Sequence, residues 1–262
     1  MKNDLYIFLD ESGTNEKNKV SIVGALAIPN DIYNSEEFNK ITGRLRSKEL
    51  KIHFTKFNKK DTEDYTELLI LLSKHAKYIR LNCILYKMSN YQTHPLYAGY
   101  LDHMIYSKLP ERAIYGVLRY FGSYSNINVT LYTEYSSQYE NSNIAFNLKR
   151  ELNIHSIYRN KSYKIIKSKL VKKNIEIGVE STDLLIGILR FIILNATEDR
   201  DSKTNREKAK FICDNMGYIY EIYENLSINE LNGGYFNNVD VKYYLGLFIG
   251  KYLNRREIDD EK

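Results

Sequence analysis

The residues LYIFL, from Leu5 to Leu9, form an uninterrupted apolar run that ends directly at the polar tetrapeptide DESG. A strand with apolar side chains on both faces has to be covered on both faces, which is typical of a strand between two layers of helices. A second apolar segment, Val20 to Ile28, follows a stretch rich in Gly, Asn and Lys, which favours a hairpin. The chain therefore begins with two strands of a sheet that helices must enclose.

Helical patterns then alternate with further buried strands. We expect a helix capped by Asn34 that runs to Leu50, and another capped by Asp61. Strands are expected in the segments RLNCILYK, INVTLYTEYSS and SYKIIKSKLV. From Asp183 to Leu194 the chain is apolar nearly all round, which is typical of a helix buried in a core. This order predicts an α/β domain with a mixed sheet flanked by helices.

The length of 262 residues allows one large domain or two small ones. We assign residues 1–197 to the α/β domain and residues 198–262 to an extension of added C-terminal helices that packs on the same domain. Between them, the polar segment EDRDSKTNREK predicts an exposed loop over 198–208. The apolar stripe of the last helix, if its own chain leaves it uncovered, would form a contact with a second copy or another protein partner.

Other features bear on location. No apolar stretch approaches the roughly 20 residues of a membrane span, and the beginning of the chain lacks the pattern of a signal peptide. The two cysteines, Cys83 and Cys213, form neither a disulfide framework nor a paired-thiol zinc site. We therefore expect a cytoplasmic protein that does not contact membranes.

Carboxylates occur where a fold gains nothing from them. Asp10 and Glu11 end the first strand, Glu134 ends a later one, and Asp183 opens the buried helix. Burial of such groups costs desolvation energy, although an acid at a helix start or in a turn also occurs for structural reasons alone. Two carboxylates about 4 Å apart repel by roughly 4 kcal/mol at an effective dielectric of 20, so a converging cluster needs a cation.

The chemistry of such a cluster is specific. An all-oxygen set of ligands selects Mg²⁺ or Mn²⁺, and two such ions about 3.5–4 Å apart are typical of phosphodiester hydrolysis. The histidines show no spacing of metal ligands, and Gly-rich phosphate-binding loops and nucleophile elbows are absent from the sequence. The carboxylates Asp10, Glu134 and Asp183 are therefore the predicted metal ligands.

Four blocks of the sequence resemble a known family. The blocks FLDESG, ELK (Glu49 to Lys51), LYTEYS and VESTDLLIGILR are similar to the signature blocks of the bacterial "domain of unknown function 3800" family, whose fold is similar to that of RNase H and retroviral integrase. The resemblance covers roughly Leu5 to Phe191. It implies an RNase H-like mixed sheet in residues 1–197 and an acidic site that binds two Mg²⁺ or Mn²⁺ ions.

The resemblance also implies roles for individual residues. Asp10 matches the first-strand aspartate of the family and Asp183 the aspartate of its late helix. Glu134 stands where the family has an aspartate, and Glu180 stands where it usually has a glutamine. Both departures leave open whether the metal site is intact. Glu49 and Glu11 complete the set of candidate catalytic residues. Glu49 is either an accessory group of the site or a solvated residue at the end of a helix.

The segment from Lys149 to Lys173 concentrates positive charge. It holds nine basic residues and one acid, whereas the whole chain has a formal net charge of only +5. Such a stretch can neutralise phosphates, although many charge runs are only solvated faces. The candidate contacts to nucleic acid are Lys161, Lys164, Lys167, Lys169, Lys172 and Lys173.

These features predict a divalent-metal-dependent phosphodiester hydrolase, a nuclease, in which Glu11 or Glu49 positions the attacking water. The family resemblance implies a setting in phage defence or mobile elements. One alternative is a non-catalytic module on the same fold that binds nucleic acid or protein and has a degenerate metal site. Another alternative is hydrolysis of a small nucleotide. The sequence does not separate DNA from RNA as the substrate.

Overall fold

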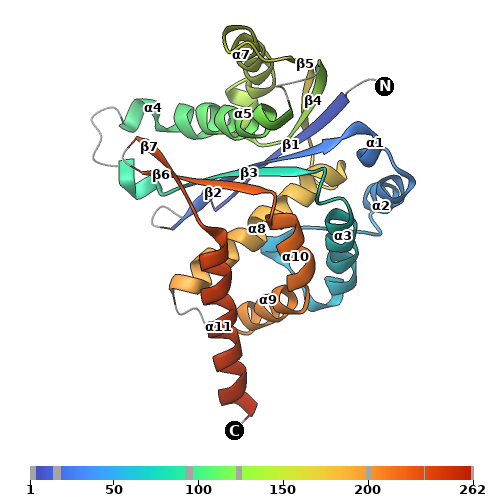
Figure 1. Cartoon of the computed structure of the whole chain (residues 1–262), viewed down its shortest axis with the longest axis vertical. Coiled ribbons are helices and arrows are strands. Elements are labelled where there is room, and N and C mark those ends of the chain that lie inside the picture. Colours follow the sequence, from blue (N-terminus) through green and yellow to red (C-terminus); the bar gives the residue numbers. More distant parts are fainter. Residues whose placement is uncertain are drawn as a thin grey trace.

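A mixed sheet of seven strands runs through the molecule in the order β5-β4-β1-β2-β3-β6-β7 (Figure 1). The computed structural model describes residues 4–13, 19–91, 97–121, 126–198, 202–232 and 234–260. The strands are β1 (Asp4–Ser12), β2 (Ser21–Pro29), β3 (Arg80–Tyr86), β4 (Ile127–Glu134), β5 (Tyr163–Val171), β6 (Leu226–Asn232) and β7 (Tyr235–Asn238). The predicted α/β class with a mixed sheet is confirmed.

The strand order places β1 in the interior of this sheet, between β4 and β2. Strand β2 is antiparallel to β1 and β3, whereas β4 is parallel to β1 and β5 is parallel to β4. Strand β6 pairs in parallel with β3, and β7 returns antiparallel to β6. The side chains of Ile7 and Phe8 are both fully buried, on opposite faces of β1, as the apolar run predicts.

Helices cover both faces of the sheet. Helices α5 and α7 pack on the face of Ile7, whereas α3, α8 and α10 pack on the face of Phe8 (Figure 1). The helices are α1 (Asn30–Tyr33), α2 (Glu36–Arg46), α3 (Thr62–Lys74), α4 (Tyr97–His103), α5 (Leu109–Phe121), α6 (Ser137–Asn141), α7 (Ile144–Tyr158), α8 (Ile177–Thr197), α9 (Lys203–Asp214), α10 (Met216–Tyr223) and α11 (Val241–Asp260). Shorter turns occupy Phe54–Lys56, Lys59–Asp61, Met88–Tyr91 and Met104–Lys108. In the described part of the chain, no helix is both long and apolar enough to traverse a bilayer.

Helix α8 is the buried helix that the sequence predicts, and it packs closely against β1 and β2. Gly24 of β2 pairs with Asp10 of β1. A Cβ atom on Gly24 would lie 2.3 Å from Cγ2 of Ile186, so only glycine leaves room for the helix here. Because Ile186 follows Asp183 by less than one helical turn, the small residue on β2 holds the helical carboxylate near the end of β1.

The first long helix differs from its predicted bounds. Helix α2 begins at Glu36, because the hydroxyl of Ser35 accepts the hydrogen bond from the backbone N–H of Phe38. Asn34, the predicted cap, donates its side-chain amide to Asn30 instead. The helix ends at Arg46 rather than at Leu50, and Lys48 then adopts the left-handed region with φ of 67°.

The C-terminal segment, residues 198–262, also differs from its prediction. The expected loop over 198–208 is wrong from Lys203 onward, because Ser202 caps α9, and the charged residues after it form the exposed side of a helix that buries Phe211. Residues 199–201 of the expected loop lie outside the described residues. The segment contains strands as well as helices. Strand β6 buries Ile228 and extends the sheet beyond β3, so the extension contributes to the same sheet.

We predict that Gly24→Ala destabilises the protein. The added methyl group has to displace the branched side chain of Ile186 in a fully packed region, which costs about 1–3 kcal/mol in the free energy of unfolding. Chemical denaturation followed by far-ultraviolet circular dichroism measures this difference. The matched control is Gly43→Ala on α2, where the new methyl group would meet nothing within 4 Å. This control should be neutral or stabilising by up to about 1 kcal/mol, and equal losses in the two variants would contradict the packing argument.

Candidate functional site

Two carboxylates meet where β4 ends and its pairing with β1 stops, two residues before the end of β1. The parallel ladder between these strands closes with the pair Leu9 and Thr133. Asp10 and Glu134 follow that pair by one residue, so their side chains start on the same face of neighbouring strands. Asp10 is only 3% exposed. The predicted meeting of these two acids is therefore present in the structure.

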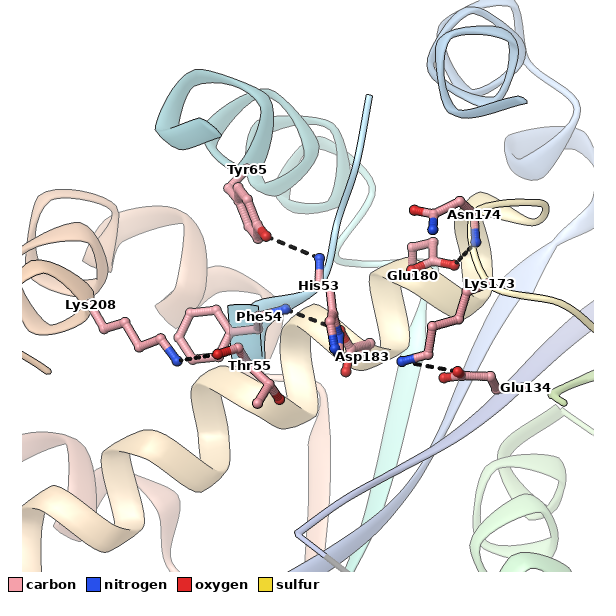
Figure 2. A network of polar contacts seen from close by, with 10 residues as sticks. All are labelled: His53, Phe54, Thr55, Tyr65, Glu134, Lys173, Asn174, Glu180, Asp183 and Lys208. Carbon is pink, nitrogen blue, oxygen red and sulfur yellow. Dashed lines mark hydrogen bonds and ion pairs between the residues drawn. The ribbon is translucent and has the colours of Figure 1, made fainter. Parts of the chain in front are cut away.

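Helix α8 brings Asp183 to the same place (Figure 2). The backbone N–H of Phe54 donates a hydrogen bond of 3.1 Å to Oδ2 of Asp183. Nδ1 of His53 lies 3.1 Å from the same oxygen. The phenol oxygen of Tyr65 in turn accepts from the backbone N–H of His53 at 3.0 Å. The segment before α3 thus fixes the orientation of the helical carboxylate.

The carboxyl group of Asp10 is poorly compensated. Its burial raises its pKa well above the ordinary value, and the nearby charges of Glu134 and Asp183 raise it further. Its Oδ2 atom is buried and receives no hydrogen bond, and the side chain within hydrogen-bonding reach of this carboxyl group is another acid, Glu134. An acceptor in this position costs free energy until a proton or a cation occupies it.

A polar cavity of about 150 Å³ opens beside Asp10. Its lining residues are Asp10, Glu11, Glu134, Tyr135, Ser136, Tyr139 and Lys173. The hydroxyl of Tyr139 donates a 2.9 Å hydrogen bond to Glu11. Burial nevertheless raises the pKa of Glu11 to about 7, and the charge of Glu134 acts in the same direction. Glu11 therefore lies where it can exchange a proton with a small polar molecule in the cavity.

Glu180 is a further buried acid of the same region. It lies on α8 almost one turn before Asp183 and is 3% exposed. Burial raises its pKa to about 7, although the backbone N–H of Asn174 donates a hydrogen bond to it and lowers the pKa. Its carboxylate therefore adds to the acidic cluster on the side of α8.

Lysine side chains partly neutralise this cluster. Nζ of Lys173 lies 3.0 Å from Oε1 of Glu134 (Figure 2). On the other side, Nζ of Lys208 donates a 3.2 Å hydrogen bond to the carbonyl oxygen of Thr55 and lies over the ring of Phe54. Burial lowers the pKa of Lys208, while the charge of Asp183 raises it.

The structure brings together some of the predicted residues and separates others. Asp10, Glu134 and Asp183 surround one region, and Glu11 lines the cavity beside it. Glu49 is exposed in the turn after α2, and the cavity lining does not include it. Lys173 lies in the cavity, whereas the other lysines are distributed along and around β5. Those lysines are Lys161, Lys164, Lys167, Lys169 and Lys172.

His53 is a site residue that the sequence analysis missed. The spacing of the histidines along the chain does not indicate a metal site. Spacing shows only neighbours on one element, whereas His53 contacts Asp183 from 130 positions away. Its place shortly after the ELK block, in the segment KIHFTKF, is the signal that could have drawn attention to it.

The donor chemistry of the site fits a hard divalent cation. The acids offer carboxylate oxygens, and Oδ2 of Asp10 is a buried acceptor without a partner. Across the residues that the structure describes, no three His, Cys, Asp or Glu side chains converge closely enough to form a complete metal site. The ammonium group of Lys173, paired with Glu134, supplies one positive charge where a metal ion would supply two. A cation would therefore bind together with a rearrangement of these side chains.

Comparisons with known proteins add no assignment. No protein-family model matches the chain, and no curated protein matches it at a significant level.

The raised pKa of Glu180 predicts a dependence of stability on pH. The pKa is about 7 in the folded chain against an ordinary value of 4.5, so the folded state holds this proton more tightly. The contribution of Glu180 to the free energy of unfolding therefore decreases as the pH rises from about 4.5 to about 7. Glu180→Gln keeps the acceptor for Asn174 and removes the charge, and should stabilise the protein by about 1–3 kcal/mol at pH 8.

Urea denaturation in the presence of a chelator measures this gain, which should be nearly absent at pH 4.5. The control is Glu221→Gln on α10, an exposed glutamate whose replacement should change the stability by less than about 0.5 kcal/mol at either pH. A Glu180→Gln variant that is less stable than the wild type at pH 8 would show that the ionised carboxylate is well compensated.

Proposed function

We propose that the chain is a divalent-metal-dependent phosphodiester hydrolase, a nuclease, on an RNase H-like fold. The observation that carries the proposal is the unpartnered, buried oxygen of Asp10 beside the carboxylates of Glu134 and Asp183. Three acids from distant parts of the chain raise the energy of the folded state unless a cation joins them. Carboxylate clusters of this kind bind Mg²⁺ or Mn²⁺ in enzymes that act on phosphodiesters.

The topology of the sheet supports the choice of fold. Strands β1, β2 and β3 form an antiparallel meander, and β4 and β5 continue the sheet in parallel from β1. This order is consistent with the RNase H-like sheet that the sequence resemblance implies. The added strands β6 and β7 extend the opposite edge, far along the sheet from the acids at the ends of β1 and β4.

Each residue of the site has a defined task in this proposal. Asp10, Glu134 and Asp183 would hold two Mg²⁺ or Mn²⁺ ions, which when bound supply activation of water and stabilisation of the leaving oxygen. The N–H group of Phe54 and the ring of His53 orient the carboxylate of Asp183. Glu11, held by Tyr139, is placed to position the attacking water, whereas the exposed Glu49 is left without a contact to this cavity.

A second candidate function is a non-catalytic module that binds nucleic acid. The ion pair between Lys173 and Glu134 favours it, because an internal ammonium group already satisfies one predicted ligand. The glutamates at positions 134 and 180, where the resembled family has an aspartate and a glutamine, point in the same direction. A phosphodiesterase that acts on small nucleotides shares the metal site with the first proposal and differs from it in lacking affinity for polymers.

We predict that Asp10→Asn and Asp183→Asn each lower cleavage of single-stranded DNA or RNA in Mn²⁺ by at least about 100-fold, equivalent to about 2.7 kcal/mol of transition-state stabilisation. Both substitutions keep the shape of the side chain and remove the charge that holds the ion. Gel assays of labelled oligonucleotides measure cleavage, and calorimetric titration with Mn²⁺ measures binding of the ion alone, which should weaken in parallel.

Asp31→Asn is the control, because Asp31 of α1 is exposed, and it should cleave as the wild type does. Cleavage that survives both substitutions in the cluster would remove the proposed site. Binding of nucleic acid without Mn²⁺ affinity and without cleavage would instead support the non-catalytic module.

A further inference from the structure

The fold divides the basic segment between Lys149 and Lys173 into two surfaces. Helix α7 packs on the face of the sheet that contains Ile7 (Figure 1). Arg150 is exposed on this helix, and the exposed Arg159 follows the helix directly, with its guanidinium over the ring of Tyr115 on α5. Strand β5 is an edge strand, and its lysines pair with positions of β4. The sequence shows one continuous charged stretch, whereas the sheet separates its members by face.

Three lysines of β5 share the face of the acidic cluster. Lys164 pairs with Asn128, Lys167 with Thr130 and Lys169 with Tyr132 along the parallel ladder. Residues directly opposite in a parallel pair start on the same face, and alternate residues of one strand share that face. Because Glu134 follows Tyr132 by two residues, these lysines and the carboxylate of Glu134 belong to one side of the sheet.

A β-bulge produces this alignment. The register shifts between Val129 and Thr130, so that Ile165 pairs with Val129 and Lys167 already pairs with Thr130. Ile166 is the extra residue. Strict alternation from Lys164 would place Lys167 on the opposite face, under α7. Bulges are known to redirect side chains at sheet edges, and this one collects Lys164, Lys167 and Lys169 into one row.

The row has positive charge that the protein itself does not neutralise. All three lysines are exposed, and none of them takes part in the ion pairs found among the described residues. Lys167 lies close enough to Lys169 to lower its pKa. The carboxylate of Glu176 acts on Lys169 in the other direction, but it is bound to Arg46 and to the hydroxyl of Tyr33. Adjacent ammonium groups of this kind favour an anionic ligand.

The dimensions of the row fit one phosphodiester backbone. Adjacent lysines are two ladder positions apart, about 6.6 Å at about 3.3 Å per residue, which equals about two steps of a stacked strand at 3.4 Å per nucleotide. The row continues toward Glu134 at the same spacing. The half-buried ring of Tyr132 lies on the same face beside Lys169 and stacks with the rings of Phe8 and Tyr6, so an unpaired base can contact only the part of this ring that remains exposed.

We propose that Lys164, Lys167 and Lys169 form a track that binds a single strand of nucleic acid and leads its backbone to the acidic cavity at the ends of β1 and β4. The direction toward the cavity rests on the proposed nuclease function, whereas binding to the track requires no metal ion. A duplex would present its backbone to the lysines but would keep its bases away from Tyr132, so the track favours unpaired strands.

The test measures binding of fluorescein-labelled single-stranded DNA and RNA of roughly 20 nucleotides, longer than common site sizes of about 4–16. Fluorescence anisotropy measures binding to the full chain, and a chelator in the buffer prevents cleavage. A salt titration gives the slope of log affinity against log salt concentration. Lys167→Gln/Lys169→Gln should weaken binding by at least about 10-fold and flatten the slope by about 1.4, because each lost phosphate contact contributes about 0.7.

The matched control is Arg150→Gln/Arg159→Gln, which removes two positive charges from α7 and the residue after it and should weaken binding by less than about 2-fold. Thermal melts check that both double variants fold. Equal losses in the two double variants, or no loss at the track, would overturn the proposal, and so would a duplex that binds as tightly as the single strand. If the chain binds with the expected pattern but does not cleave, the nuclease proposal is refuted and the track proposal stands. If it cleaves but binds without that pattern, the track proposal is refuted and the nuclease proposal stands.

Discussion

The burial of α8 against β1 and β2 is the constraint on which the candidate site depends. This helix is apolar nearly all round, so it has to lie inside the molecule, and it packs where Gly24 leaves room for Ile186. The same packing carries Asp183 from the second half of the chain to Asp10 at the end of the first strand. The hydrophobic effect thus supplies the free energy that holds two like charges together.

The acids bear an electrostatic cost that the protein compensates only in part. Backbone N–H groups of Phe54 and Asn174 donate to Asp183 and Glu180, and Lys173 pairs with Glu134. These contacts stabilise the rim of the cluster, while Asp10 at its centre keeps an unpartnered oxygen. Buried polar groups without a partner are uncommon in native structures, and an ion or a catalytic role is one explanation for them. The open oxygen of Asp10 is therefore consistent with the cation that the proposed function places there.

Much of this arrangement could be predicted from the sequence, because local patterns determine it. Apolar runs predicted β1 and α8, and acids at the ends of predicted elements indicated that Asp10, Glu134 and Asp183 could converge. The parallel pairing that brings Asp10 and Glu134 together is seen only in the structure. The contact of His53 with Asp183 could not be predicted, because it joins residues 130 positions apart. Strand β6 was missed for a related reason: its pairing with β3 depends on tertiary structure rather than on local composition.

The bulge at Ile166 shows why charge along a sequence is a weak guide to a surface. One inserted residue changes the face of the sheet on which Lys167 and Lys169 lie. The periodicity of the segment KIIKSKLV does not predict where the register shifts. The redirected lysines also bear on the acidic cavity, because a polyanion that approaches carboxylates is repelled unless positive charge accompanies it. A lysine track on the same face can hold the backbone, while cations in the cavity remove the repulsion at the point of reaction. The lysine row and the acidic cavity lie on one face of the sheet, so a strand bound along the lysines would reach the carboxylates without crossing the sheet.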